Sequence, residues 1–184
     1  MKEGKHVKAK ICLVGQAAVG KTSLIRRYVV DQFDDKYVAT LGTKVTKRVV
    51  EVPIPNGGGL RARVELLIWD VMGQPKIREL LDDLYFQGAA GILAVADCTR
   101  RATLDTLVDW LDRVNRITNR APIVLAVNKS DLKANAEFGP AEVGRLVGSV
   151  RGGVLETSAK TGENVEEAFR RLALFVLDRS PGPG

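Results

Sequence analysis

The stretch Gly15-Gln16-Ala17-Ala18-Val19-Gly20-Lys21-Thr22 decides the fold of this chain. It follows the pattern G-x-x-x-x-G-K-[ST], which is typical of a phosphate-binding loop. The apolar run 10–14 precedes it and a helix-like segment follows, so the loop joins a predicted strand to a predicted helix. Such a loop turns backbone N–H groups toward one point, where the helix dipole adds positive potential. Its glycines allow an anion to approach the backbone closely.

Two side chains of this stretch complete the predicted phosphate site. Lys21 is expected to reach the β- and γ-phosphates of a nucleotide, and the Thr22 hydroxyl is expected to bind Mg²⁺. The alternative is a glycine-rich turn with a chance Lys-Thr pair. The strand before the loop and the helix after it favour the phosphate site.

The rest of the chain alternates between strand and helix patterns. We predict strands at 8–14, 43–52, 61–69, 89–96, 122–127 and 154–157, and helices at 20–30, 103–117, 140–150 and 164–178. The segment 53–59, with two prolines and three glycines, predicts a hairpin turn at a sheet edge. Asn164 and Glu167 have the spacing of a capping box. The expected fold is a three-layer α/β sandwich with a mostly parallel six-stranded sheet and one antiparallel edge strand. We expect one domain over residues 1–184, with its core at about 8–179.

Composition excludes several classes of protein. The chain has 184 residues, of which 45% are hydrophobic and 27% are charged, as in an ordinary globular domain. Cys12 and Cys98 are too few for a disulfide framework, which favours a reduced, cytoplasmic setting. We find no apolar run long enough to span a membrane and no signal peptide.

The net charge is +6, from 28 Lys and Arg against 22 Asp and Glu. This excess fits a solvated surface, and the alternative is attraction to an anionic membrane or an acidic partner. Aromatic residues make up only 5% of the chain and no basic patch is interleaved with them, so nucleic-acid binding is not expected.

Three predicted strands end in polar residues, where ligands bind in parallel sheets. The run 66–70 ends in Asp70, which we expect to hold Mg²⁺ through a water, and the Gly73 N–H could meet the γ-phosphate. The run 124–131 ends in N-K-x-D. The two oxygens of Asp131 match the N1–H and N2–H donors of guanine, which adenine lacks. The Lys129 stem could lie along the base, and the Ala159 N–H could donate to guanine O6. An ATP-dependent kinase or ATPase fits the phosphate loop but not this N-K-x-D run.

With these residues in order, the chain resembles the Ras superfamily of small GTPases over about residues 10–179, and its switch region is most like the Rab branch. The resemblance is carried by residues 15–22, 33–42, 69–74, 128–131 and 156–160. It implies that Thr40 binds Mg²⁺ and the γ-phosphate, that Phe33 packs beside guanine, and that Tyr37 lies over the phosphates. Gln74 would orient the attacking water.

The resemblance implies hydrolysis of GTP to GDP and phosphate, with Mg²⁺ as cofactor. The implied catalytic residues are Gln74, Lys21 and Thr40, and the implied Mg²⁺ ligands are Thr22, Thr40 and Asp70. The implied nucleotide-binding residues are Gly15, Ala17, Ala18, Val19, Gly20, Lys21, Thr22, Ser23, Phe33, Tyr37, Thr40, Gly73, Asn128, Lys129, Asp131, Ser158, Ala159 and Lys160.

Several departures from the family pattern concern turnover. Pro75 pushes Gln74 toward extended conformations, and Ala17 stands where Ras has glycine and could crowd an arginine from an activating protein. No arginine lies in 31–43, so slow hydrolysis is expected. The alternative is a binding module that holds guanine nucleotide with little hydrolysis.

The family resemblance also implies partners. Effectors, exchange factors and GTPase-activating proteins would bind two switch regions, 31–43 and 70–85, of a monomer. No cysteine follows Cys98 and Lys2 occupies the myristoylation position, so no lipid anchor is expected on this chain. Either a tail has been removed or this is a soluble relative.

Overall fold

The computed structural model of the chain describes residues 5–31, 43–55, 57–71, 84–147 and 152–179. Six strands form one sheet in the order β2-β3-β1-β4-β5-β6. Strand β2 runs antiparallel to β3 at one edge, and the other neighbouring strands are parallel. The predicted mostly parallel sheet with one antiparallel edge strand is therefore confirmed. The strands are β1 (His6–Val14), β2 (Thr43–Pro53), β3 (Arg61–Val71), β4 (Ala89–Asp97), β5 (Ile123–Asn128) and β6 (Val154–Glu156).

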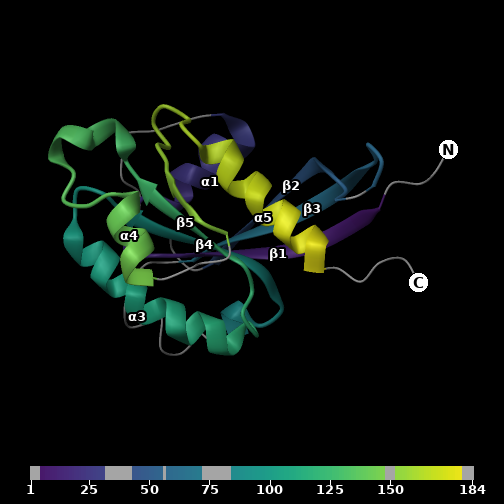
Figure 1. Cartoon of the computed structure of the whole chain (residues 1–184), viewed down its shortest axis with the longest axis horizontal. Coiled ribbons are helices and arrows are strands. Elements are labelled where there is room, and N and C mark those ends of the chain that lie inside the picture. Colours follow the sequence, from purple (N-terminus) through teal and green to yellow (C-terminus); the bar gives the residue numbers. More distant parts are fainter. Residues whose placement is uncertain (1–4, 32–42, 56, 72–83, 148–151, 180–184) are drawn as a thin grey trace.

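Helices cover both faces of this sheet. They are α1 (Lys21–Val30), α3 (Arg101–Ile117), α4 (Pro140–Val147) and α5 (Val165–Arg179), with a 3₁₀ helix η1 (Ser130–Asn135). Figure 1 shows α1 and α5 on one face of the sheet and α3 on the other, which gives three layers. Within the described residues, no helix has the length and apolar character needed to cross a membrane.

The sequence of β1 shows why both faces are covered. Ile11 and Leu13 point into the cluster packed under α1 and α5, whereas Cys12 and Val14 point into the cluster under α3. All four side chains are 0–2% exposed. Successive side chains of a strand point to opposite faces, so a continuously apolar strand needs cover on both sides.

The parallel strands β1, β3, β4 and β5 end at the same edge of the sheet, on the left in Figure 1. The residues at or just after three of these ends are Gly15, Asp97 and Asn128. Loops that are distant in sequence therefore meet at this edge, which is where ligands bind in open parallel sheets.

Some predicted bounds differ from the structure by one or two residues. Helix α3 begins at Arg101 and β1 begins at His6, each two residues before the predicted start. The predicted end of α4 at 150 lies outside the described ranges. The predicted capping box is wrong. The Asn164 amide donates to the Glu156 carbonyl at 2.8 Å, and the Glu167 carboxylate accepts hydrogen bonds from Arg170 and Arg171.

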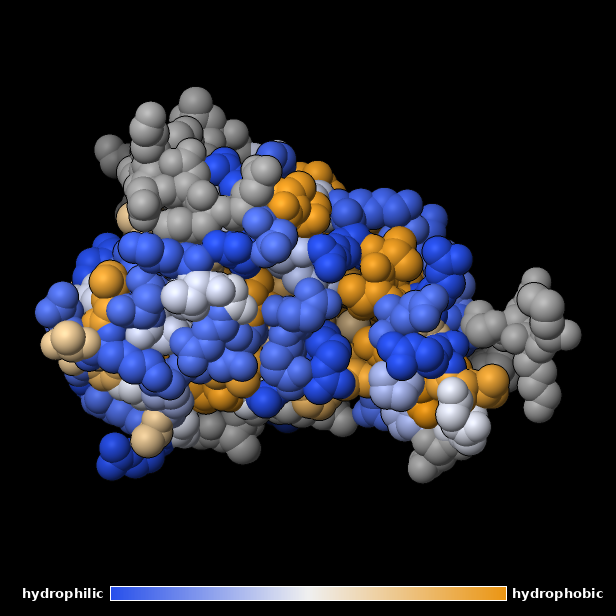
Figure 2. All heavy atoms as spheres, turned by 90° about the horizontal axis from the view of Figure 1, so that it is seen from above, coloured by the Kyte–Doolittle hydropathy of each residue, from blue (hydrophilic) through white to orange (hydrophobic). Residues whose placement is uncertain are grey.

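Figure 2 looks onto the face that carries α1 and α5 and shows a mainly hydrophilic surface with separate hydrophobic patches. Single exposed apolar side chains are ordinary on folded proteins. Among the described residues, the large hydrophobic side chains that are exposed are Val30, Val45, Val49, Leu60, Leu84 and Leu132.

Candidate nucleotide site

The loop between β1 and α1 follows a path that requires its two glycines. Gly15 has φ of 146° and Gly20 has φ of 102°. A Cβ on Gly15 would lie 2.3 Å from the Val95 carbonyl oxygen, and a Cβ on Gly20 would lie 2.3 Å from Asn128 Nδ2. Backbone this closely packed at a helix N-terminus is suited to an anion, because the first N–H groups of a helix have no acceptor within the helix itself.

Lys21 and Thr22 begin α1 directly after this loop. The Lys21 side chain, 6% exposed, curls back over the loop, where its ammonium group donates to the carbonyl oxygens of Gly15 at 2.9 Å and Gln16 at 2.8 Å. The Thr22 hydroxyl donates to Asp70 Oδ2 at 2.5 Å. The sequence-predicted lysine, hydroxyl and carboxylate therefore lie together beside the phosphate loop, although Asp70 is 48 residues away from Thr22 in sequence.

These residues fit a nucleotide with Mg²⁺. A Cβ at Gly15 or Gly20 would collide with Val95 or Asn128, so only glycine lets the loop take this close path at the start of α1. The Thr22 hydroxyl and the Asp70 carboxylate are hard oxygen ligands, which Mg²⁺ prefers. No cluster of three or more His, Cys, Asp or Glu suited to a metal occurs in the described part of the chain. Mg²⁺ keeps several waters and phosphate oxygens as ligands, so the two protein oxygens of Thr22 and Asp70 are in keeping with its coordination.

Asn128 ties the phosphate loop to a second loop. Its side-chain NH₂ donates to the Val19 carbonyl at 2.8 Å. Its Oδ1 accepts hydrogen bonds from the Thr157 hydroxyl at 3.2 Å and from the Ala159 N–H at 3.3 Å. Asn128 is only 1% exposed, so the loss of any of these bonds would leave a buried polar group without its partner.

The predicted base-recognition residues lie beside Asn128. Asp131 is exposed, and its Oδ1 accepts a hydrogen bond of 2.6 Å from the Ser158 hydroxyl. The Ser158 oxygen accepts one from the Thr161 N–H at 3.1 Å, which shapes the loop that carries Ala159 and Lys160. Lys129 has φ of 66°, a left-handed conformation, at the turn into η1. The strand-end residues of β5 and the loop after β6 therefore form one surface.

Asp97 is a central residue of the site that the sequence interpretation missed. Its Oδ2 lies 2.6 Å from Lys129 Nζ and accepts a 3.0 Å hydrogen bond from Arg100 Nε. Its Oδ1 accepts from the Thr99 N–H and hydroxyl at 3.0 and 2.7 Å. Arg100 in turn donates to the Ala17 carbonyl at 3.0 Å. One buried carboxylate thus links the phosphate loop to the N-K-x-D turn.

The protonation of Asp97 follows from these contacts. Burial alone would raise the pKa of the carboxyl group, but the hydrogen bonds from Lys129, Thr99 and Arg100 outweigh it and hold the pKa below its ordinary value. Asp97 is therefore a carboxylate at neutral pH. The signal that could have identified it is its position at the end of β4, matching Asp70 on β3 and Asn128 on β5.

The remaining predicted residues divide into two groups. Ser23 lies in the first turn of α1, and Ala17, Ala18 and Val19 lie in the phosphate loop, with Ala18 at a φ of 61°. The second group lies outside the described ranges, as do most of the two switch regions. Its members are Phe33, Tyr37, Thr40, Gly73 and Gln74.

The fold and the phosphate loop together define a P-loop nucleotide-binding protein of the α/β class. The family model described as the Ras family matches residues 10–178. The chain therefore belongs to the Ras family.

Individual relatives place it near the Rab proteins. The chain is 36% identical to the Ras-related protein Rab-4A of Rattus norvegicus over 171 residues, which is 92% of this chain and 75% of that protein. It is 36% identical to the Ras-related protein Rab-4B of Homo sapiens, over 92% of this chain and 76% of that protein. It is 32% identical to the GTP-binding protein ypt4 of Schizosaccharomyces pombe, over 97% of this chain and 75% of that protein. The chain is a Rab-like small GTPase, a hydrolase that acts as a nucleotide-dependent switch.

Proposed function

We propose that this GTPase binds guanine nucleotide with Mg²⁺ at the edge of the sheet where β1, β3 and β5 end. The observation that carries the proposal is the Asn128 side chain, which bonds both the phosphate loop and the loop at 157–159. That contact sets the distance between a phosphate-binding element and a base-binding element. In this arrangement Lys21 and the loop backbone bind the phosphates, and Asp131 with Ala159 reads guanine.

The metal ligands would come from two elements. Thr22 on α1 and Asp70 on β3 already share a hydrogen bond, so both oxygens are within reach of one ion. Mg²⁺ held by these residues would offset the charge that develops during phosphoryl transfer. Thr40 is proposed as a further ligand in the GTP state.

Hydrolysis would proceed by in-line attack of water, with no covalent intermediate. Lys21 would offset charge on the transferring phosphoryl group, and Gln74 would orient the water. No arginine lies in 31–43 to stabilise the transition state, so turnover without a partner would be slow. In Ras itself and related GTPases, an arginine supplied to the site accelerates hydrolysis ~10³–10⁵-fold.

The competing proposal is a guanine-nucleotide-binding module with little hydrolysis. It is motivated by Pro75, which restricts Gln74, and by Ala17 in the phosphate loop. Release of phosphate in a single turnover of preloaded protein discriminates the two. Slow but measurable release supports a working GTPase, and the absence of release over many hours supports the binding module. A Pro75→Glu variant tests the restriction on Gln74, since an unchanged rate would contradict it.

We further propose that the regions 31–43 and 70–85 bind effectors, exchange factors and activating proteins according to the nucleotide state. A pulldown compares protein loaded with a non-hydrolysable GTP analogue and protein loaded with GDP. Partners retained only in the first state would support the switch regions as the docking surface. Equal retention in both states would contradict it.

A further inference from the structure

Arg27, on the last turn of α1, reaches across to the loop that follows β6. Its Nε donates to the Ala159 carbonyl at 2.8 Å, and its Nη2 donates to the Lys160 carbonyl at 2.5 Å. Its Nη1 donates to the Asp31 carboxylate at 3.0 Å. The side chain is 19% exposed. All three nitrogens of one guanidinium group are therefore engaged, two of them by consecutive carbonyls 132 and 133 residues away.

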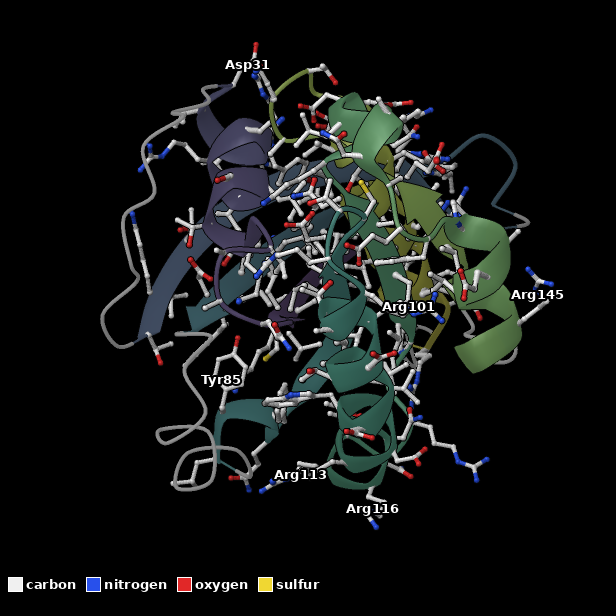
Figure 3. The ribbon with its side chains drawn as sticks, turned by 90° about the vertical axis from the view of Figure 1, so that its left-hand side faces the viewer. Asp31, Tyr85, Arg101, Arg113, Arg116 and Arg145 are labelled. Atoms are coloured by element: carbon white, nitrogen blue, oxygen red, sulfur yellow. The ribbon has the colours of Figure 1, made fainter. Side chains whose placement is uncertain are left out.

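The bonded loop carries the proposed base-reading group. The Ala159 N–H donates to Asn128 Oδ1 at 3.3 Å, whereas the Ala159 carbonyl accepts a hydrogen bond from Arg27 Nε at 2.8 Å. The two ends of one residue are thus held from opposite sides. Figure 3 shows Asp31 at the end of α1, and the arginine contacts bind this helix end to the loop before α5.

We propose that Arg27 is a positioning residue for guanine recognition: by holding the carbonyls of Ala159 and Lys160, it fixes the loop whose Ala159 N–H, a donor to Asn128 Oδ1 in this structure, would donate to the O6 atom of a bound base. The inference rests on the proposed function, because it assigns a role within the same nucleotide site. It adds a residue from α1, the helix that begins with the phosphate-binding Lys21, to the recognition of the base.

The chemistry requires arginine rather than another cation. A guanidinium group presents five N–H donors in a fixed planar fork, so it can bond two carbonyls and a carboxylate at once. A lysine ammonium at the end of a flexible stem is a point charge and would keep the charge without fixing both carbonyls. Helix α1 also fixes Arg27 relative to the phosphate-binding Lys21, because the two residues are about 9 Å apart along one helix axis at about 1.5 Å per residue.

The experiment compares three nucleotides on the full chain with Mg²⁺ present. These are GDP, 6-thio-GDP, in which a weakly accepting sulfur replaces O6, and inosine diphosphate, which lacks the 2-amino group. The affinity ratio of GDP to 6-thio-GDP reports the O6 contact, and the ratio of GDP to inosine diphosphate reports the contact with Asp131. In the unmodified protein, one neutral hydrogen bond predicts an O6 ratio of roughly two- to tenfold.

Arg27→Gln should bring the O6 ratio close to one and leave the inosine ratio unchanged. Dissociation of GDP should accelerate about two- to tenfold, as expected for the loss of the one neutral hydrogen bond to O6. Arg27→Lys should reproduce the loss of the O6 ratio, and it provides a second variant if the glutamine variant folds poorly. Arg26→Gln is the matched control, because it makes the same charge change on an exposed position of the same helix.

The outcomes separate the two proposals. An O6 ratio that stays at the wild-type value in both Arg27 variants would overturn the positioning role, and so would an equal fall in both ratios, which indicates a general weakening of the site. If the unmodified protein fails to bind GDP, the proposed function itself is overturned. A selective fall in the O6 ratio, absent from the Arg26 control, supports the inference.

Discussion

Replacing Asp97 with asparagine should destabilise the nucleotide site more than any exposed charge change. Asparagine keeps one acceptor oxygen for Thr99 but loses the charged oxygen that faces Lys129 at 2.6 Å and Arg100 at 3.0 Å. Hydrogen bonds to charged groups are worth about 1.5–3 kcal/mol each, so two of them give about 3–6 kcal/mol. The side chains of Lys129 and Arg100 are 33% and 41% exposed and can regain water. We therefore expect a loss of about 2–4 kcal/mol in the free energy of unfolding.

Urea unfolding in excess GDP and Mg²⁺ measures this loss. Bound nucleotide adds to apparent stability, so two GDP concentrations separate weaker binding from a weaker fold. Asp105→Asn is the control, because its carboxylate is 66% exposed and lies 3.7 Å from Arg101. That variant should stay within about 0.5 kcal/mol of wild type. A loss below about 0.5 kcal/mol for Asp97→Asn as well would refute the argument that this carboxylate holds the site together.

The same contact predicts a pH dependence. The pKa of Asp97 is lower in the folded protein than in the unfolded chain. The carboxylate therefore contributes stability that is present above its unfolded pKa of about 3.9 and is lost as the pH falls through the folded pKa. The difference in stability between wild type and Asp97→Asn should be constant between about pH 6 and 8 and should narrow below about pH 4. A difference that grows on acidification would contradict the assignment.

Three further variants or reactions test other parts of the structure. Gly20→Ala should lower the affinity for GDP, measured by calorimetry, at least about tenfold. The new Cβ would lie 2.3 Å from the Asn128 amide, and an alanine in this left-handed backbone conformation costs about 1–2 kcal/mol. An unchanged affinity would show that the loop can relax. Cys12 should resist a thiol reagent at about pH 8 in the folded protein and should react once the protein is unfolded in urea. The reason is that burial raises the pKa of its thiol to about 12. Rapid reaction of the folded protein would contradict this expectation. Tyr85→Phe should lower the free energy of unfolding by about 0.5–1.5 kcal/mol, measured by thermal unfolding. The hydroxyl of Tyr85 (labelled in Figure 3) donates to the Trp69 carbonyl at 2.7 Å, and phenylalanine cannot make this bond. A more stable variant would argue against that bond.

Periodicity and turn chemistry predicted the sheet and the helices because they depend on local sequence. The phosphate loop and the prolines of the hairpin were interpretable for the same reason, and β2 is indeed the edge strand. The helix ends were less predictable. Asn164 is of a residue type that often caps helices, but it adopts a left-handed φ of 52° and its side-chain amide donates to the Glu156 carbonyl instead.

The contacts that define the site were harder to predict because they join residues that are distant in sequence. Arg100 bonds Ala17 across 83 residues, and Arg27 bonds Ala159 across 132. A single sequence does not indicate which carbonyl oxygen the side chain of a helical arginine will reach. Asp97 did carry a sign, because it ends a buried strand at the same edge as Asn128.

The most direct test of the central claim is the choice of base by wild type and by Asp131→Asn. Wild-type protein should bind GDP at least about tenfold more tightly than xanthosine diphosphate, because xanthine keeps N1–H but turns a carbonyl oxygen toward the carboxylate in place of the N2–H donor. The substituted side chain retains an amide oxygen that can still accept the hydrogen bond from the Ser158 hydroxyl, so the variant should remain folded. It should prefer xanthosine diphosphate. A variant that keeps the preference for GDP, or wild-type protein that binds ADP as tightly as GDP, would contradict a guanine switch at this site.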